Sequence, residues 1–208
     1  MSHEHSHDHD HSELPEMDLR VRALESLLVE KGYVDPAALD MIIDTYENRI
    51  GPRNGAHVVA KAWTEPDFLK WLTEDATAAI HSLGYMSRQG EHMVAVAQSD
   101  TTHHMVVCTL CSCYPWSVLG LPPTWYKSPP YRSRAVIDPR GVLQDFGIEL
   151  PEGVGVEVHD STAETRYLVI PQRPDGTDDW DVEALMRLVT RNSMIGTGYA
   201  LNPDELTR

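Results

Sequence analysis

Hydrophobic residues recur every three or four positions between Met17 and Gly84, which is the spacing of one face of an α-helix. A first stripe, ended by Gly32, consists of Val21, Leu24, Leu27 and Leu28. A second begins at Asp35-Pro36, typical of a helix start, and consists of Leu39, Ile42, Ile43, Tyr46 and Ile50. A third consists of Phe68, Leu72, Ala76, Ala79 and Leu83. We therefore expect a helical arm over residues 17–84, whose apolar faces need a partner surface within this chain or on another.

After Gly84 the pattern changes to short runs of β-branched residues bounded by polar turns. The predicted strands are residues 93–97, 105–107, 134–137, 154–159 and 166–170. Short helices are expected from Asp138-Pro139 to Phe146 and over residues 182–191. Strands interleaved with short helices predict an α+β fold, in which the helical arm precedes a mixed, layered domain over residues 85–208.

Residues 1–16 carry five of the eleven histidines, interspersed with acidic residues. Such a segment has too few apolar residues to form a core, so we expect a disordered tail that binds divalent metals loosely.

Acidic residues outnumber basic ones by 32 to 17, and the formal net charge is -15. Phosphate binding needs clustered lysine and arginine, so this balance argues against a nucleic-acid partner. The sequence has neither an apolar run of membrane-spanning length nor a secretory leader at its start, and a cytoplasmic protein is therefore expected.

All three cysteines lie in one short segment, Val107–Trp116, which reads VCTLCSCYPW. A disulfide framework uses an even number of cysteines spread along the chain, so this cluster indicates metal or redox chemistry. Tetrahedral zinc needs a fourth ligand, which His103 or His104 would have to supply because a second CxxC is missing. The spacing alone therefore leaves a structural zinc site open but incomplete.

The triplet Cys111-Ser112-Cys113 permits a different metal site. If the amide nitrogens of Ser112 and Cys113 lose their protons, they form a planar ligand set with the sulfurs of Cys111 and Cys113. Cys108 can then cap this plane, and the opposite position stays open for water or substrate. Thiolates with amide nitrogens create a strong ligand field, which suits trivalent iron or cobalt better than zinc.

The segment resembles the alpha subunit of nitrile hydratases, and the likeness extends well beyond the cysteines. Residues 119–128 (LGLPPTWYKS), 162–167 (TAETRY) and 171–174 (PQRP) follow in the order typical of that family. The resemblance implies an enzyme that hydrates small nitriles to amides, with three cysteine sulfurs and two backbone amides holding a metal. It also implies that Cys111 and Cys113 are oxidised to sulfinic and sulfenic forms.

Family members work with a beta subunit, as αβ or α2β2, and mature with the help of an activator protein. The resemblance therefore implies that this chain is inactive alone. Thr109 and Tyr114 resemble cobalt-type members, so cobalt(III) is the expected cofactor rather than iron(III). Ser117 departs from the family, which commonly has proline there, and we expect only a local change in the loop.

Four further residues are candidates by position. The Ser112 hydroxyl is placed to donate toward an oxygen on a ligand sulfur, although its backbone alone could be what matters. Gln89 resembles a family glutamine near the substrate channel, and an exposed turn residue is the alternative. Trp116 is expected to line the apolar substrate pocket, and Arg166 to lie behind the ligands, where a surface salt bridge is the alternative. His103 and His104 are expected at solvent or an interface.

Two other functions stay open. A thiocyanate hydrolase metal-binding subunit uses the same cysteine loop on a related fold. A non-catalytic zinc-binding module would hold zinc on unmodified thiols, without an open position.

Overall fold

The computed structural model describes residues 16–45, 51–85, 92–111 and 113–207. Contacts divide the chain into two units, Met1–Asp44 and Thr45–Arg208. The division falls at residue 44, whereas the sequence pattern predicted an arm that reaches residue 84. The histidine-rich tail, Gln89 and Ser112 lie outside the described residues.

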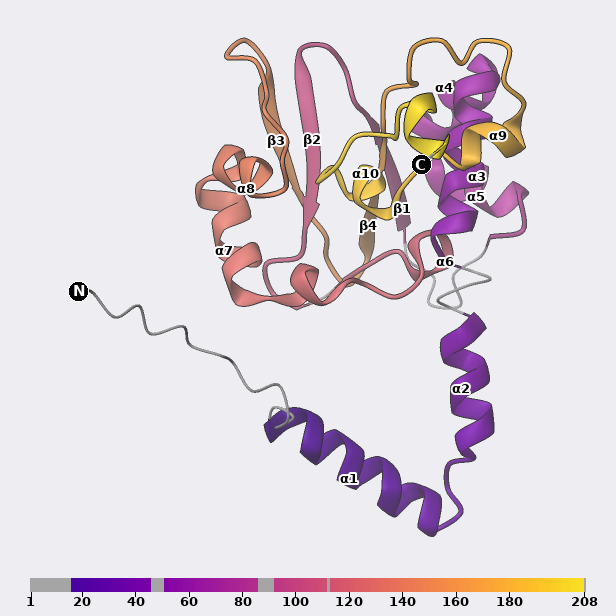
Figure 1. Cartoon of the computed structure of the whole chain (residues 1–208), viewed down its shortest axis with the longest axis vertical. Helices are drawn as coiled ribbons and strands as arrows, with labels where there is room; N and C mark the ends of the chain where they lie inside the picture. The colour runs from indigo at the N-terminus through magenta and orange to yellow at the C-terminus, as the bar shows by residue number, and fades with distance from the viewer. Residues whose placement is uncertain (1–15, 46–50, 86–91, 112, 208) are drawn as a thin grey trace, which may run out of the picture. The chain divides into compact units, whose positions relative to one another are not determined.

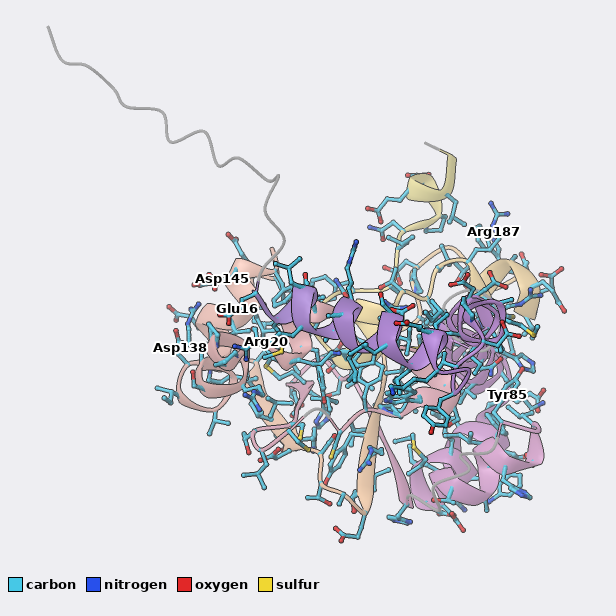
Figure 2. All side chains as sticks on the ribbon, turned by 90° about the horizontal axis from the view of Figure 1, so that it is seen from below. Glu16, Arg20, Tyr85, Asp138, Asp145 and Arg187 are labelled. Atoms are coloured by element: carbon cyan, nitrogen blue, oxygen red, sulfur yellow. The ribbon has the colours of Figure 1, made fainter. Side chains whose placement is uncertain are left out.

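The first unit contains two helices, α1 (Glu16–Glu30) and α2 (Pro36–Asp44), which begin where the sequence predicted. The predicted continuation of the second helix through Tyr46 and Ile50 lies outside the described residues. Asp35 caps α2, because its carboxylate accepts a hydrogen bond from the Ala37 amide at 2.9 Å. An ion pair between Glu16 and Arg20 joins successive turns of α1 (Figure 2). Neither helix has a buried residue. The large apolar side chains exposed on α1 are Met17, Leu19, Val21, Leu24 and Leu27.

The second unit starts with three helices: α3 (Gly51–Thr64), α4 (Pro66–Glu74) and α5 (Ala76–Ser82). The predicted helix through residues 68–83 is therefore two helices, because Asp75 leaves the helical conformation and caps α5 through the Ala78 amide. Helix α3 has no predicted counterpart, since Gly51, Pro52 and Gly55 weaken the helical signal. Its Gly55 is needed where α3 packs on the segment behind the cysteines: an added Cβ would lie 2.7 Å from the Val118 carbonyl oxygen.

Four parallel-paired strands form two small sheets, visible as neighbouring pairs in Figure 1. Strand β1 (His92–Ala97) pairs with β4 (Thr165–Ile170), and β2 (Thr102–Val107) pairs with β3 (Gly155–Asp160). These strands coincide closely with four of the predicted ones. Helices α4 and α5 contact β1, α8 contacts β3, and β2 also contacts β4. The mixture of helices and small parallel sheets confirms the predicted α+β class.

The remaining helices are short: α6 (Trp116–Leu119), η2 (Thr124–Lys127), α7 (Pro129–Ile137), α8 (Pro139–Asp145), α9 (Val182–Met186), α10 (Arg191–Ile195) and η3 (Pro203–Thr207). The predicted strand over residues 134–137 is wrong, because these residues end α7. Ser128 caps that helix through the Tyr131 amide, two prolines occupy its first turn, and Tyr131 and Ala135 are buried one turn apart. The predicted helix over residues 182–191 begins at Val182 as expected but ends at Met186, and Thr190 then starts α10 with a capping box.

The core of the second unit lies between the strands and the helices that cover them. Its largest fully buried side chains include Leu72, Ile80, Met105, Leu119, Tyr126, Leu143 and Leu168. Helices α3 to α5 thus contribute to the same core as the strands. In the part of the chain that the structure describes, no helix combines the length and apolar character needed to span a bilayer.

Gly196 ends α10 with a φ of +86° directly against strand β2. A Cβ there would lie 2.0 Å from the His104 carbonyl oxygen, and the Gly196 carbonyl accepts a hydrogen bond from the buried His103 ring at 2.7 Å. Only glycine suits this position, because it tolerates both the left-handed backbone and the close approach.

We expect Gly196→Ala to lower the free energy of unfolding by clearly more than the roughly 1–2 kcal/mol that the left-handed conformation costs alone. The matched control is Gly176→Ala, where φ is +73° but nothing lies within 4 Å of the added Cβ. Urea denaturation of both variants measures the difference. Equal losses would show that the contact with β2 contributes nothing.

Candidate metal centre

The cysteine loop, residues 108–113, begins where strand β2 ends. In the parallel register of β2 and β3, Val107 pairs with Asp160, so both strands end at the same edge. The carboxyl ends of parallel strands are a usual place for functional loops, because side chains from neighbouring strands converge there. Cys108 and Asp160 therefore lie at the same edge of the strand pair, although Thr109 and Asp160 are 51 positions apart in the sequence.

The three cysteine sulfurs form one cluster. The Sγ atom of Cys108 lies 3.3 Å from that of Cys111, which lies 3.0 Å from the sulfur of Cys113. The three side chains range from buried Cys108 through half-buried Cys113 to exposed Cys111. The loop therefore has a closed side toward the core and an open side toward solvent.

The surroundings of Cys113 favour its protonated thiol in the absence of a metal. Burial raises the pKa of Cys113 to about 12, and its hydrogen bond with Cys111 and the neighbouring Cys108 act in the same direction. The cation of Arg166 opposes this rise, so it favours negative charge on the Cys113 sulfur. A metal cation bound among the sulfurs would displace the thiol protons, and its positive charge would offset the repulsion between the resulting thiolates.

Residues outside the loop fix its backbone. Asp160 accepts hydrogen bonds from the Thr109 amide at 2.9 Å and from the Thr109 hydroxyl at 2.6 Å. Arg132 on α7 donates to the Cys111 carbonyl at 3.2 Å. The buried Tyr126 hydroxyl donates to the Cys113 carbonyl at 3.0 Å. Burial raises the pKa of Tyr126, so this hydroxyl stays protonated and remains a donor.

Aromatic rings form the floor under the loop. Tyr114 is buried, and its ring centre lies 5.1 Å from that of Tyr126, with an edge-to-face angle of 70°. Trp125 continues the cluster, with ring centres 4.8 Å from Tyr131 and 4.7 Å from Phe146. Edge-to-face contacts of this kind add to area burial, so the floor is a rigid apolar support.

The predicted site residues that the structure describes differ in burial and in their distance along the chain from the cysteine loop. Cys108, Cys111 and Cys113 are together as expected, and Arg166 on β4 is buried and acts electrostatically on Cys113. It is therefore not the surface arginine of the alternative. Trp116 follows the loop at the start of α6 and is 43% exposed.

His103 corrects another expectation. It is buried and its ring donates to the Gly196 carbonyl, so it does not lie at solvent. Among the described residues, the group around the cysteines consists of Cys108, Cys111 and Cys113, so His103 adds no fourth ligand to it. Ser117 is also buried in α6, and its carbonyl accepts a hydrogen bond from Asn54 at 3.0 Å, which anchors the local segment.

The donor set fits a soft or borderline transition metal. Three sulfurs with their ligand atoms within 4.8 Å of one another can bind one ion without a rearrangement of the strands. The open side at Cys111 leaves access for a small molecule, and the buried side at Cys108 supplies a fixed anchor.

The family model described as "Nitrile hydratase, alpha chain" matches residues 15–198. The chain belongs to this family. It is 58% identical over 192 residues to the high-molecular weight cobalt-containing nitrile hydratase subunit alpha of Rhodococcus rhodochrous, which covers 92% of this chain and 95% of that protein. The resemblance found in the sequence is thereby confirmed.

Two other relatives bear on the function. A double mutant of the Fe-type nitrile hydratase from Comamonas testosteroni Ni1 superposes with a TM-score of 0.82 at 38% identity, over 92% of this chain and 94% of that one. The gamma subunit of thiocyanate hydrolase from Thiobacillus thioparus is 40% identical over 195 residues, or 88% of this chain and 80% of that protein. Chains similar to this one thus occur in enzymes named for different metals and substrates.

Sequence reasoning missed the residues that hold the loop: Asp160, Arg132 and Tyr126. Tyr126 lies in the LGLPPTWYKS segment that carried the resemblance, so its position was marked but not its hydrogen bond. Asp160 could have been found from the end of a predicted strand, as the residue that parallel pairing brings beside Cys108. Arg132 precedes the residues misread as a strand, which hid its place on α7.

We expect Asp160→Ala to loosen the loop without unfolding the second unit. Both hydrogen bonds to Thr109 are lost. At about 1 kcal/mol net for each bond, this gives on the order of 30-fold faster exchange of the Thr109 amide hydrogen. Hydrogen-exchange mass spectrometry measures this. The matched control is Asp145→Ala, which removes an exposed carboxylate paired with Arg134 on α7 (Figure 2 labels Asp145). Unchanged exchange at Thr109 would contradict the role of Asp160.

Proposed function

We propose that the chain is the metal-binding subunit of a cobalt nitrile hydratase, which adds water to small nitriles and releases the amides. The cluster of three cysteine sulfurs at the end of β2 carries this proposal. It occurs in a chain 58% identical to a cobalt-containing nitrile hydratase subunit. In the proposed centre, the sulfurs of Cys108, Cys111 and Cys113 and the backbone amides of Ser112 and Cys113 hold cobalt(III).

The choice of cobalt over iron rests on Thr109 and Tyr114. Thr109 uses its hydroxyl to bind Asp160, and Tyr114 packs its ring on the aromatic floor. These side chains therefore shape the ligand loop from both ends, although neither is a ligand. When bound, a trivalent cobalt ion supplies a strong Lewis acid at an open position.

The surrounding residues have distinct roles in the proposed reaction. In the proposed reaction, a single oxygen on the Cys113 sulfur would have one of two roles. It would take a proton from water as the water oxygen bonds to the nitrile carbon, or it would bond to that carbon itself and be restored when water displaces the product. In both cases the two hydrogens of water end on the amide nitrogen, and oxidised Cys111 would accept hydrogen bonds beside the site. Arg166 favours negative charge at Cys113, as its effect on the Cys113 pKa indicates. Ser112 donates toward the oxidised sulfur, and Gln89 orients the substrate.

The substrate pocket is proposed to be shared with a second chain. Trp116 is 43% exposed beside the cysteine loop, as expected for a wall that another subunit completes. The apolar stripe on α1 is exposed as well, which suits a helix that docks on a partner. We therefore propose a beta subunit, in an αβ or α2β2 assembly, and an activator protein that delivers the metal. The three cysteines are clustered in one loop and not spread along the chain as disulfide partners, so we place the enzyme in the cytoplasm.

Coexpression with a beta subunit and an activator, followed by assays with nitrile and with thiocyanate, tests the proposal. We expect amide formation, cobalt near one ion per chain, and two and one added oxygens on Cys111 and Cys113 by peptide mass spectrometry. Cys113→Ala should abolish activity, whereas Ser117→Pro, in α6 outside the ligand loop, should retain it.

The outcomes separate the alternatives. Hydrolysis of thiocyanate without nitrile hydration would make the chain a thiocyanate hydrolase subunit, which the likeness to the gamma subunit favours as the second candidate. Zinc on three unmodified thiols, with no activity beside the beta subunit, would make it a zinc-binding module. Iron with nitrile hydration would overturn only the choice of metal.

The raised pKa of Cys113 gives a pH prediction for the unmodified thiols. Cys113 must lose its proton to bind a metal, and with a pKa of about 12 it is protonated across the neutral range. Affinity for cobalt(II) should therefore rise with pH, by about tenfold per unit from this thiol alone. Competition titrations with a coloured chelator at several pH values measure the slope. Cys113→Ala should reduce the slope by about one proton, and an unchanged slope would contradict the prediction.

A further inference from the structure

A second group of metal-binding side chains lies on the strand pair β2 and β3, outside the cysteine loop. It consists of His104, Glu157 and His159, whose ligand atoms all lie within 4.8 Å of one another. The Nδ1 atom of His104 lies 2.9 Å from Nε2 of His159 and 3.5 Å from a carboxylate oxygen of Glu157. No residue of this group belongs to the proposed cobalt centre.

The parallel register brings these three side chains together. His104 pairs with Glu157, and alternation along a strand puts Glu157 and His159 on one face of β3. The ring of Tyr167 on β4 packs against His159, with ring centres 5.0 Å apart. The His104 side chain is 14% exposed and that of Glu157 is 62% exposed. The two imidazoles thus lie largely packed against the strands, whereas the Glu157 carboxylate lies on the solvent side of the group.

We propose that His104, Glu157 and His159 form a second metal site, for a divalent transition metal of the zinc class. Two imidazoles and a carboxylate are a common zinc ligand set with a fourth position left for water. Donor atoms about 3.3 Å apart are what tetrahedral bonds of 2.0–2.1 Å require. The observed separations of 2.9 and 3.5 Å lie on either side of this value, so small side-chain shifts suffice.

The site links the two strands that carry the cysteine loop. His159 directly precedes Asp160, whose carboxylate holds Thr109. A metal bound to His104 on β2 and His159 on β3 therefore clamps the edge at which the loop begins. The proposal does not depend on nitrile hydration or on cobalt, because its ligands and its donor chemistry differ from those of the cysteines.

Zinc uptake by the full-length chain tests the site. The parent, His159→Gln and the control His81→Gln are dialysed against buffered free zinc, and bound zinc is measured by elemental analysis. Because the tail histidines and the cysteines are the same in all three, the difference between variants reports this cluster. We expect one zinc fewer per chain in His159→Gln and none fewer in His81→Gln, which changes an exposed histidine on α5.

A second variant guards against misfolding. Glu157→Gln replaces a largely exposed side chain and should leave the circular dichroism spectrum unchanged. We expect it to weaken zinc binding by more than about tenfold, since loss of even an outer-shell partner costs about 10- to 100-fold. Zinc should also raise the melting temperature of the parent more than that of Glu157→Gln. Equal zinc uptake and equal thermal shifts in the parent and both cluster variants would overturn the site and leave a hydrogen-bonded histidine pair.

Discussion

The parallel pairing of β2 with β3 is the interaction on which the metal centre depends. It converts a separation of 51 residues between Thr109 and Asp160 into a direct hydrogen bond. A loop with three neighbouring cysteines has many conformations, and ordering each residue costs about 1–2 kcal/mol. Because the strand pair fixes one end of the loop before any metal binds, less conformational entropy is lost when the metal orders the rest.

The loop combines two demands that oppose each other. Sulfur ligands must be close enough for one ion to bind them all, yet close thiols resist ionisation, as the raised pKa of Cys113 shows. The fold meets both demands by burying Cys108 against the core and leaving Cys111 exposed. Hydrogen bonds to the Cys111 and Cys113 carbonyls hold the backbone from outside, so the sulfurs themselves remain available as ligands.

The sequence was informative where local patterns determine structure. The four paired strands, the first two helices and the cysteine cluster could all be predicted, because periodicity and spacing are local signals. Helix α3 could not, since its Gly55 reflects a contact with Val118 that no local pattern reveals. Residues 134–137 look like a strand only if the capping Ser128 and the two prolines are ignored. The partners of the loop were also hidden: Asp160 and Arg132 are ordinary charged residues until pairing and packing place them beside Thr109 and Cys111.

The contact between Gly196 and β2 changes how the end of the chain should be regarded. The Gly196 carbonyl, in the turn after α10, accepts a hydrogen bond from the buried His103. Gly196 also lies directly against the backbone of His104, within the strand that leads to the cysteines. Shortening the chain before α10 would leave that imidazole without its acceptor and uncover one side of β2. The last part of the chain therefore supports the strand from which the cysteine loop begins. An enzyme shortened there for crystallisation or fusion would have a less rigid ligand loop.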